Sequence, residues 1–206
     1  MPRGFTEREQ EKIRQKLVDA GKYYFSSQGL KKTGVKELTD KAGIAQGSFY
    51  RFFQSKELLY FYILEMEEEV IREAVLKQLI STSNVTASLF ASVLLKALTM
   101  IEKHPLTYRL YTSDDYDYLM RKLPTERLSE HAEQDTMSFT PLLSAWKKQG
   151  ILKPDLYENV ISGVLRGFFL LITHKREIGG DVYDETMTFM AYAIANEIFR
   201  EGEVER

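Results

Sequence analysis

The sequence predicts an all-α protein, and three observations support this. Residues 35–53 have the pattern of two short helices joined by a tight turn. Apolar residues recur at three- and four-residue spacing through most of the remaining chain, which is the period of a helix. Glycines and prolines stand between these stretches, where helices are expected to begin or end.

The first part of residues 35–53 has one apolar face. Val35, Leu38 and Ala42 share it at helical spacing. Gly43 then provides the backbone freedom that a tight turn requires, and Ile44 returns an apolar side chain to the core. We therefore expect a helix up to Ala42 and a turn directly after it.

The second part predicts a helix that is poor in aliphatic residues and begins near Gln46. Phe49 and Phe53 are four residues apart and can anchor it inward. Its other side chains can donate to phosphates or reach base edges in a major groove; they are Gln46, Ser48, Tyr50 and Arg51. An ordinary helical hairpin with a solvated polar face remains the alternative for so short a pattern.

Two further helices are predicted on either side of this unit. Thr6 and Glu9 have the spacing of a capping box, and a helical apolar stripe runs from there to Gly29, which ends it. A longer helix starts near Ser55 and continues to about Leu79. We expect it to join the N-terminal part to the rest of the chain.

At this point the chain resembles the TetR family of bacterial transcriptional regulators. The residues that carry the resemblance span about the first third of the chain: Gly29, Thr33, Leu38, Ala42, Gly43, Ile44, Gly47, Ser48, Phe49, Tyr50, Phe53, Lys56, Glu57 and Leu58. Two positions depart from the family pattern, with Thr39 where Ala is usual and Gly34 where Thr is frequent. The resemblance implies a helix-turn-helix DNA-binding domain over residues 1–54 and a helical effector-binding and dimerisation domain over residues 55–206.

For the N-terminal domain we expect contact with double-stranded DNA. Tyr50 and Lys56 are expected to fix the position on phosphates, while Gln46, Ser48, Arg51 and Phe52 are expected to carry sequence preference. The full set of predicted DNA-binding residues is Thr33, Val35, Lys36, Gln46, Gly47, Ser48, Tyr50, Arg51, Phe52 and Lys56.

The charge distribution agrees with this expectation. Residues 1–60 hold 12 Lys and Arg against 7 Asp and Glu, whereas residues 61–206 hold 16 against 23, within a chain of net charge −2. A basic segment on an acidic body is expected when only that segment meets nucleic acid. Chance variation of surface charge would give a similar pattern.

The remaining residues predict further helices. One runs from about 86 to 103, and a short one follows Pro105. A long helix then ends at Gly150, and Pro141 should kink or split this helix. Residues 113–124 have the most loop-like composition. The last two helices start near Pro154 and Tyr183, and the second of them should run to about Arg200 and close at Gly202.

We expect these last two helices to form a homodimer interface, because two DNA-binding units about 34 Å apart bind far more DNA surface than one. The resemblance implies the same arrangement, as a four-helix bundle. The expected interface residues are Gly163, Gly167, Phe168, Leu171, Met187, Met190, Ala191, Ile194, Ala195 and Ile198. The alternative is that the two glycines admit an internal neighbour.

The resemblance also implies a small-molecule site among the middle helices, whose ligand would shift the long helix and weaken DNA binding. Candidate lining residues are Phe90, Leu94, Leu98, Tyr108, Tyr111, Met137, Trp146, Phe168, Phe169 and His174. For any one of them, ordinary core packing is the better explanation. Asp114, Asp115 and Asp117 would favour a cationic effector, or simply belong to an exposed loop.

Other classes of function find little support. The sequence contains no cysteine, which excludes disulfides and cysteine nucleophiles. His104, His131 and His174 lack metal-binding spacing, and no phosphate-binding glycine loop or nucleophile elbow occurs, so we expect no enzyme activity, no metal and no cofactor. No apolar run has the length of a membrane span. We expect a cytoplasmic, ligand-responsive repressor that binds a palindromic operator; the alternative is an all-helical dimeric interaction protein with little DNA binding.

Overall fold

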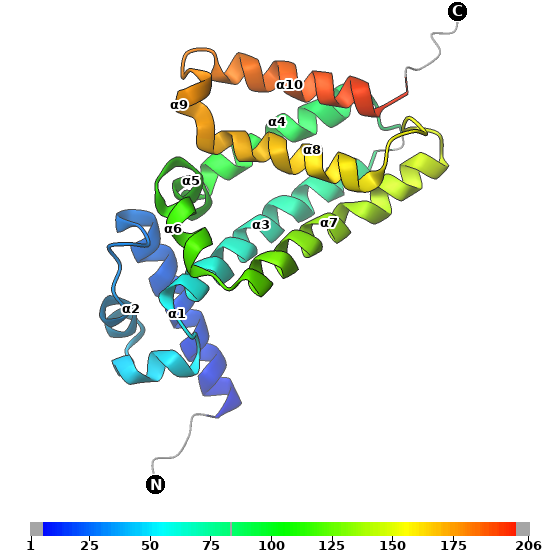
Figure 1. The fold of residues 1–206 in the computed structure, drawn as a ribbon. Helices are drawn as coiled ribbons and strands as arrows, with labels where there is room; N and C mark the ends of the chain where they lie inside the picture. Colours follow the sequence, from blue (N-terminus) through cyan, green and yellow to red (C-terminus); the bar gives the residue numbers. More distant parts are fainter. Residues whose placement is uncertain (1–5, 83, 201–206) are drawn as a thin grey trace, which may run out of the picture. The chain divides into compact units, whose positions relative to one another are not determined.

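The protein is helical, as the sequence predicts (Figure 1). The structure is a computed structural model that describes residues 6–82 and 84–200, without the side chains of residues 111, 132 and 135–138. No β-strand occurs in these ranges, apart from an isolated bridge between Leu152 and Phe199. The elements are α1 (Glu7–Gln28), α2 (Val35–Ala42), η1 (Gln46–Arg51), α3 (Lys56–Ile80), α4 (Ala87–Lys103), α5 (Pro105–Thr112), α6 (Asp115–Lys122), α7 (Thr125–Lys148), α8 (Glu158–Leu170), η2 (Leu171–His174), α9 (Lys175–Ile178) and α10 (Tyr183–Ile198).

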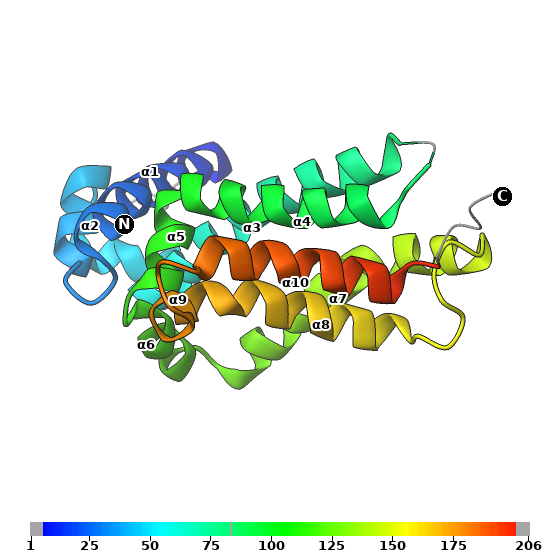
Figure 2. The same ribbon diagram turned by 90° about the horizontal axis from the view of Figure 1, so that it is seen from above.

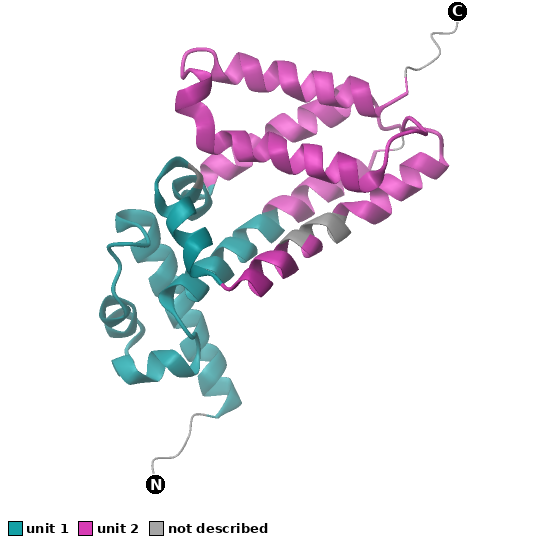
Figure 3. Ribbon diagram, in the orientation of Figure 1, with its two compact units in different colours: residues 1–70, 104–123 teal, residues 71–103, 124–206 magenta. Residues whose placement is uncertain are grey.

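The chain forms two compact units (Figure 3). Unit 1 comprises residues 1–70 and 104–123, and unit 2 comprises residues 71–103 and 124–206. The division falls inside α3, and unit 1 includes α5 and α6 as well as the N-terminal helices. These packing units differ from the functional division at residue 54 that the sequence predicts, and that division stays a prediction.

Unit 1 is built around α1. The predicted capping box is present, since Glu9 N–H donates to Thr6 Oγ1 at 3.3 Å and Thr6 N–H donates to Glu9 Oε2 at 2.8 Å. Gly29 ends α1 with φ 85°, and its N–H donates to Phe25 O at 3.1 Å. The side chains that α1 buries meet those of the other elements of this unit, and the fully buried set includes Leu17, Phe25, Leu30, Leu38, Phe49, Leu59, Tyr60, Phe61, Ile63, Leu106 and Leu110.

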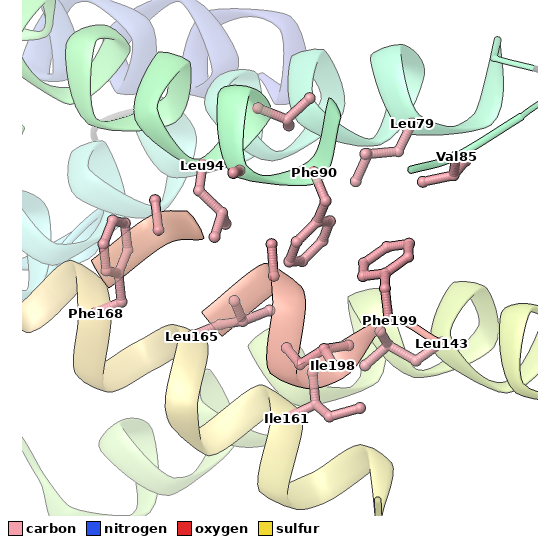
Figure 4. Close-up of a cluster of buried hydrophobic side chains, with 14 of the residues drawn as sticks. Leu79, Val85, Phe90, Leu94, Leu143, Ile161, Leu165, Phe168, Ile198 and Phe199 are labelled. Carbon is pink, nitrogen blue, oxygen red and sulfur yellow. The ribbon is translucent and has the colours of Figure 1, made fainter. Parts of the chain in front are cut away.

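Unit 2 is held by an apolar cluster between α4, α8 and α10, to which the ends of α3 and α7 contribute (Figure 4). α10 packs along α4, and α7 packs against α8; α8 and α10 lie side by side in Figures 1 and 2. The rings of Phe90 and Phe199 are 5.3 Å apart, and Trp146 packs edge-on to Phe90 at 6.0 Å. Burial of such aromatic rings is the main stabilising contribution in a core of this kind.

Three expectations about elements were wrong. Residues 115–122 form α6 rather than a loop, because Asp115 and Asp117 lie at its N-terminus and Arg121 and Lys122 at its C-terminus, where their charges complement the helix dipole. Pro141 does not split α7, which continues past the one backbone hydrogen bond that proline, lacking an N–H, cannot donate. The helix expected from Gln46 to Phe53 is a short 3-10 helix that ends at Arg51.

The last helix ends at Ile198, followed by Phe199 in extended conformation, and Gly202 lies outside the described residues. None of the helices within residues 6–82 and 84–200 is long and apolar enough to cross a membrane.

Candidate nucleic-acid interface

The turn between α2 and η1 depends on Gly43. Its φ of 72° and ψ of 36° lie in the left-handed region, which is costly for residues with a Cβ. Its N–H donates to Asp40 O at 3.2 Å, and Ile44 N–H donates to Thr39 O at 3.0 Å. A Cβ at this position would meet no atom within 4 Å, so the backbone conformation alone requires glycine.

The start of α2 is fixed without a capping side chain, because the cap residue is Gly34. Instead, the Glu37 carboxylate accepts the Gly34 N–H at 2.8 Å and the Gln28 amide at 3.1 Å. The hydrogen bond from Gly34, followed by the one from Gln28, lowers the pKa of Glu37 below its ordinary value. The departure from the family pattern at Gly34 therefore leaves α2 with a defined N-terminus.

The inner side of η1 is anchored by two phenylalanines. Phe49 and Phe53 are buried, with ring centroids 6.2 Å apart. The Arg14 guanidinium lies over the Phe53 ring at 4.8 Å and over the Tyr62 ring at 4.7 Å, which closes this side of the core with a cation-π contact. The short helix is therefore held rigidly from within, and its opposite face is available to solvent.

That opposite face gathers four of the predicted DNA-binding residues. Tyr50 is 58% exposed, and Gln46, Gly47 and Arg51 are exposed beside it on η1. A Cβ on Gly47 would meet nothing within 4 Å, so the fold itself does not require glycine there. We call these four residues the η1 face. It offers an amide, a phenol and a guanidinium, which are groups that donate to phosphates and base edges.

The neighbouring predicted residues are less exposed or already paired. Ser48 and Phe52 are half-buried, and Val35 is half-buried at the start of α2. Lys36 is exposed and forms an ion pair with Asp40 one turn later, which raises the pKa of Lys36. Ala45 is exposed directly before η1.

Two predicted contacts have other roles in the structure. Thr33 is fully buried, and its hydroxyl donates to Gly29 O at 2.8 Å, so its side chain cannot serve an external partner. Lys56 Nζ donates to Leu30 O at 2.7 Å and to Thr33 O at 2.8 Å, with Lys31 O at 3.3 Å. An ammonium group has three protons, so these carbonyls occupy the donors that a phosphate would need.

The candidate effector residues do not all come together. Phe90, Leu94, Trp146 and Phe168 belong to the buried cluster of unit 2, with Leu98 and Phe169 packed against it. Tyr108 belongs to unit 1 and is partly exposed, and the His174 side chain is exposed beside Glu177. These two positions therefore do not line that cluster. The side chains of Tyr111 and Met137 lie outside the described residues.

The acidic residues near α6 also differ from expectation. Asp115 is buried, whereas Asp114 and Asp117 are exposed. Asp115 Oδ2 lies 3.8 Å from Arg109 Nε and accepts a backbone N–H, so this carboxylate already has partners within the protein.

Half of the expected interface residues are buried inside unit 2. Phe168, Met187, Ala191, Ala195 and Ile198 are at most 5% exposed, because α10 packs against α4 and Phe168 of α8 lies in the same buried cluster. They cannot at the same time form the outer surface of a subunit. Leu171, Met190, Ile194 and Gly163 are half-buried, whereas Gly167 is exposed, and a Cβ on it would meet no atom within 4 Å.

The outward side of α8 and α10 carries a different apolar set. Phe189 is 76% exposed on α10. The other exposed apolar residues of these two helices are Val160, Val164, Leu170 and Tyr192. We call these five residues the α8–α10 face. Exposed apolar residues gathered on neighbouring helices are often found at protein contact surfaces.

The described side chains show no cluster of three or more His, Cys, Asp or Glu residues that could hold a metal ion.

Comparison with known proteins places this surface in context. Residues 17–63 match the family model described as bacterial regulatory proteins, tetR family, a range that includes most of α1, α2, η1 and the start of α3. The repressor KstR2 of Mycolicibacterium smegmatis is 40% identical over 60 residues, which is 29% of this chain and only 26% of that protein.

Longer matches are more distant. KstR2 of Mycobacterium tuberculosis H37Rv is 23% identical over 159 residues, covering 74% of this chain and 76% of that protein. The probable acrEF/envCD operon repressor of Escherichia coli K12 is 26% identical over 176 residues, covering 80% and 76%.

Solved structures agree at the level of the fold. A TetR-family transcriptional regulator from Pectobacterium atrosepticum has a TM-score of 0.75 at 16% identity and covers 97% of this chain and 100% of its own. RolR without ligand has a TM-score of 0.59 at 17% identity, covering 91% and 98%. Residues 17–63 thus match the DNA-binding region of the tetR family of bacterial regulatory proteins, and the whole chain shares the helical fold of solved TetR-family regulators.

Proposed function

We propose that the protein is a homodimeric repressor that binds a palindromic DNA operator through the η1 face and is released by a small-molecule effector. Its functional domains are residues 1–54 for DNA binding and residues 55–206 for effector binding and dimerisation. It acts in the cytoplasm, where the chromosome of a bacterium lies, and it has no catalytic role.

The η1 face is the observation that carries this proposal. Phe49 is fully buried beneath it, while Tyr50 and Arg51 project outward from the same short helix. A rigid element that presents donors on an exposed surface fits the major groove of DNA. Tyr50 is the residue for phosphate contact, whereas Gln46 and Arg51 supply base contacts.

Dimerisation is supported by the α8–α10 face. One DNA-binding unit of this size buries too little DNA surface for tight, specific binding, and two such units one helical turn apart double the contact. Because the other apolar side of α10 is occupied by α4, the α8–α10 face is the surface that remains for a second subunit.

Effector release is supported by the composition of unit 2. Its cluster includes Phe90, Trp146 and Phe168, aromatic side chains suited to an apolar organic ligand. The ligand must bind the DNA-free conformation more tightly than the DNA-bound one, and a coupling of about 1 to 3 kcal/mol is typical.

The proposal is tested by selecting binding sequences from a random duplex pool with the purified protein, at two salt concentrations. We expect a palindrome whose half-sites lie about one helical turn apart and whose binding weakens with salt. The protein with Arg51→Ala serves as a matched sample in the same selection.

Failure of the folded wild-type protein to enrich any sequence would refute DNA binding. The alternative of an all-helical interaction protein would then follow, and the α8–α10 face would be its contact surface. Enrichment of a single half-site without a palindrome would refute the dimeric arrangement.

A further inference from the structure

The loop of residues 29–34, which joins α1 to α2, is held by two oppositely charged side chains. The Leu30 N–H donates to Asp115 Oδ2 at 3.1 Å. On the other side of the same residue, Leu30 O accepts from Lys56 Nζ at 2.7 Å, and Thr33 O accepts from the same ammonium at 2.8 Å. The Asp115 carboxylate thus accepts the loop's backbone N–H, and the Lys56 ammonium donates to the loop's carbonyl oxygens. Hydrogen bonds with a charged partner are shorter and stronger than neutral ones.

Asp115 belongs to α6, 85 residues after Leu30. It is 5% exposed, and its own N–H donates to Ser113 Oγ at 3.2 Å. Arg109 Nε, on α5, lies 3.8 Å from the same Oδ2 atom and is buried without a hydrogen-bond partner among the described residues. The Arg109 charge compensates the buried carboxylate, while the carboxylate's short contact is the one to the loop.

Gly29 makes this approach possible. With φ 85° it adopts a conformation that favours glycine, and a Cβ there would lie 2.8 Å from Arg109 Nη2 and 2.9 Å from Asp115 Oδ2. Gly29 therefore has a second role besides ending α1. It leaves the space in which the Arg109–Asp115 pair reaches the loop.

The α5–α6 pair is itself tied to α3 by polar contacts. Tyr118 Oη donates to Glu57 Oε1 at 3.0 Å, and Tyr60 Oη donates to Leu106 O at 3.2 Å. Burial raises the pKa of Tyr60 far above its ordinary value, so this phenol stays a neutral donor. Thr107 N–H donates to Glu67 Oε2 at 3.0 Å. Loop 29–34, the part of α3 in unit 1, α5 and α6 are therefore linked by hydrogen bonds while Asp115 keeps its bond to Leu30.

We propose that Asp115 is a positioning residue that makes loop 29–34, and with it α2 and the η1 face, follow the position of α5 and α6. The chain passes from unit 2 into α5 at residue 104 and leaves α6 for unit 2 at residue 123. The pair is therefore joined to unit 2 through the backbone at both ends. Only the last step, the effect on DNA binding, rests on the proposed function.

The proposal predicts a local loosening when the carboxylate loses its charge. In Asp115→Asn, hydrogen exchange at the Leu30 amide should be roughly tenfold faster or more, because a charge-assisted hydrogen bond is replaced by a weaker one. Asp117→Asn is the matched control, since Asp117 lies on the same helix and is exposed. It should leave Leu30 exchange unchanged.

A distance measurement separates positioning from simple stabilisation. The sequence contains no cysteine, so Lys36→Cys on α2 and Arg121→Cys on α6 accept spin labels at those sites alone. In the otherwise wild-type background the distance distribution between the labels should be narrow, and Asp115→Asn should broaden it. A merely structural role would speed exchange in α4 and α10 as well, without broadening this distribution in the folded protein.

DNA binding is measured with the duplex that the wild-type protein selects. Asp115→Asn should lower affinity roughly tenfold while the salt dependence stays the same, because no phosphate contact is removed. If Leu30 exchange and the label distribution are unchanged, the proposal is wrong. It is also wrong in its last step if both change and affinity does not. If the wild-type protein binds no duplex, the proposed function fails. Hydrogen exchange at Leu30 and the spin-label distances then still decide whether Asp115 positions loop 29–34.

Arg109→Gln decides the question if Asp115→Asn does not fold. This side chain is 35% exposed, so its replacement is better tolerated than that of the buried carboxylate. Loss of the compensating charge should speed Leu30 exchange and broaden the label distribution in the same direction, to a smaller extent. No change in either measurement would refute the proposal.

Discussion

The two units of the molecule differ in the contacts that stabilise each of them internally. In unit 1, charged side chains such as Lys56 and Asp115 bind backbone groups of distant elements. In unit 2, the helices meet through rings and aliphatic chains such as Phe90 and Trp146, and a polar contact such as Lys147 Nζ to Leu156 O lies at the half-exposed edge. Directional bonds specify one geometry, whereas apolar packing specifies volume. Unit 1 thus adds directional bonds to its apolar core, whereas the core of unit 2 rests mainly on apolar packing.

The largest expected effect is on the apolar packing of unit 2. Phe90→Ala removes a ring that contacts Trp146 and Phe199, and we expect a loss of about 3 to 5 kcal/mol in the free energy of unfolding. Urea unfolding followed by fluorescence of Trp146, the single tryptophan, reports this unit directly. Ile80→Ala, at a 68% exposed position, is the control and should change little. Equal losses in the two variants would contradict the contrast.

A smaller but more local effect is expected in unit 1. Lys56→Met keeps the length of the side chain and leaves the carbonyls of Leu30 and Thr33 without their donor, at a cost of about 1 to 3 kcal/mol in unfolding free energy. The salt dependence of DNA binding should stay unchanged in Lys56→Met. The variant Lys32→Met, at an exposed position, shows how far the loss of an ordinary surface charge changes that salt dependence. If Lys56→Met instead flattens the salt dependence by about one counterion, Lys56 binds phosphate as the sequence suggested.

Arg51→Ala sharpens the comparison at the η1 face, where orientation should matter for specificity. We expect it to relax preference at one or two base pairs per half-site by about 1 to 3 kcal/mol each, without loss of stability. Competition binding with singly substituted duplexes measures this. Gln54→Ala, also exposed and just beyond η1, is the control. A uniform loss of affinity across all duplexes would assign Arg51 to phosphate contact instead.

The smallest effect concerns the polar contact at the start of α2. Hydrogen bonding from Gly34 and Gln28 lowers the pKa of Glu37 in the folded protein, so the ionised form stabilises the fold. That contribution is present above the ordinary pKa of 4.5 and is lost as the pH falls through the lowered value.

Glu37→Gln should therefore reduce the loss of thermal stability between about pH 6 and about pH 3. Melting curves across this range, with Glu7→Gln as an exposed control on α1, provide the measurement. An unchanged pH profile in Glu37→Gln would show that the contact contributes nothing.

The features that sequence reasoning identified are local ones. The capping box of Thr6 and Glu9, the end of α1 at Gly29 and the turn at Gly43 each depend on residues within a few positions. Phe49 and Phe53 were recognised as anchors because their spacing puts them on one side of a helix. Such signals need no knowledge of distant parts of the chain.

The features it missed depend on partners far along the chain. The ammonium of Lys56 binds carbonyls 23 and 26 residues earlier, and Asp115 binds Leu30 across 85 residues. Periodicity showed that α10 has an apolar side containing Met187 and Ala191, but not that α4 covers it. An apolar pattern shows that a surface is buried and leaves open which neighbour buries it.

The continuity of α3 through both units has a consequence for protein engineering. A fragment that stops at residue 54 would lack Leu59, Tyr60 and Ile63, and also Leu106 and Leu110, all fully buried in unit 1. The first 54 residues are therefore not expected to fold as an independent DNA-binding domain. A chimera that transplants them onto another regulator should carry α5 and α6 along, and a graft of the first 54 residues alone would expose the unmatched half of a core.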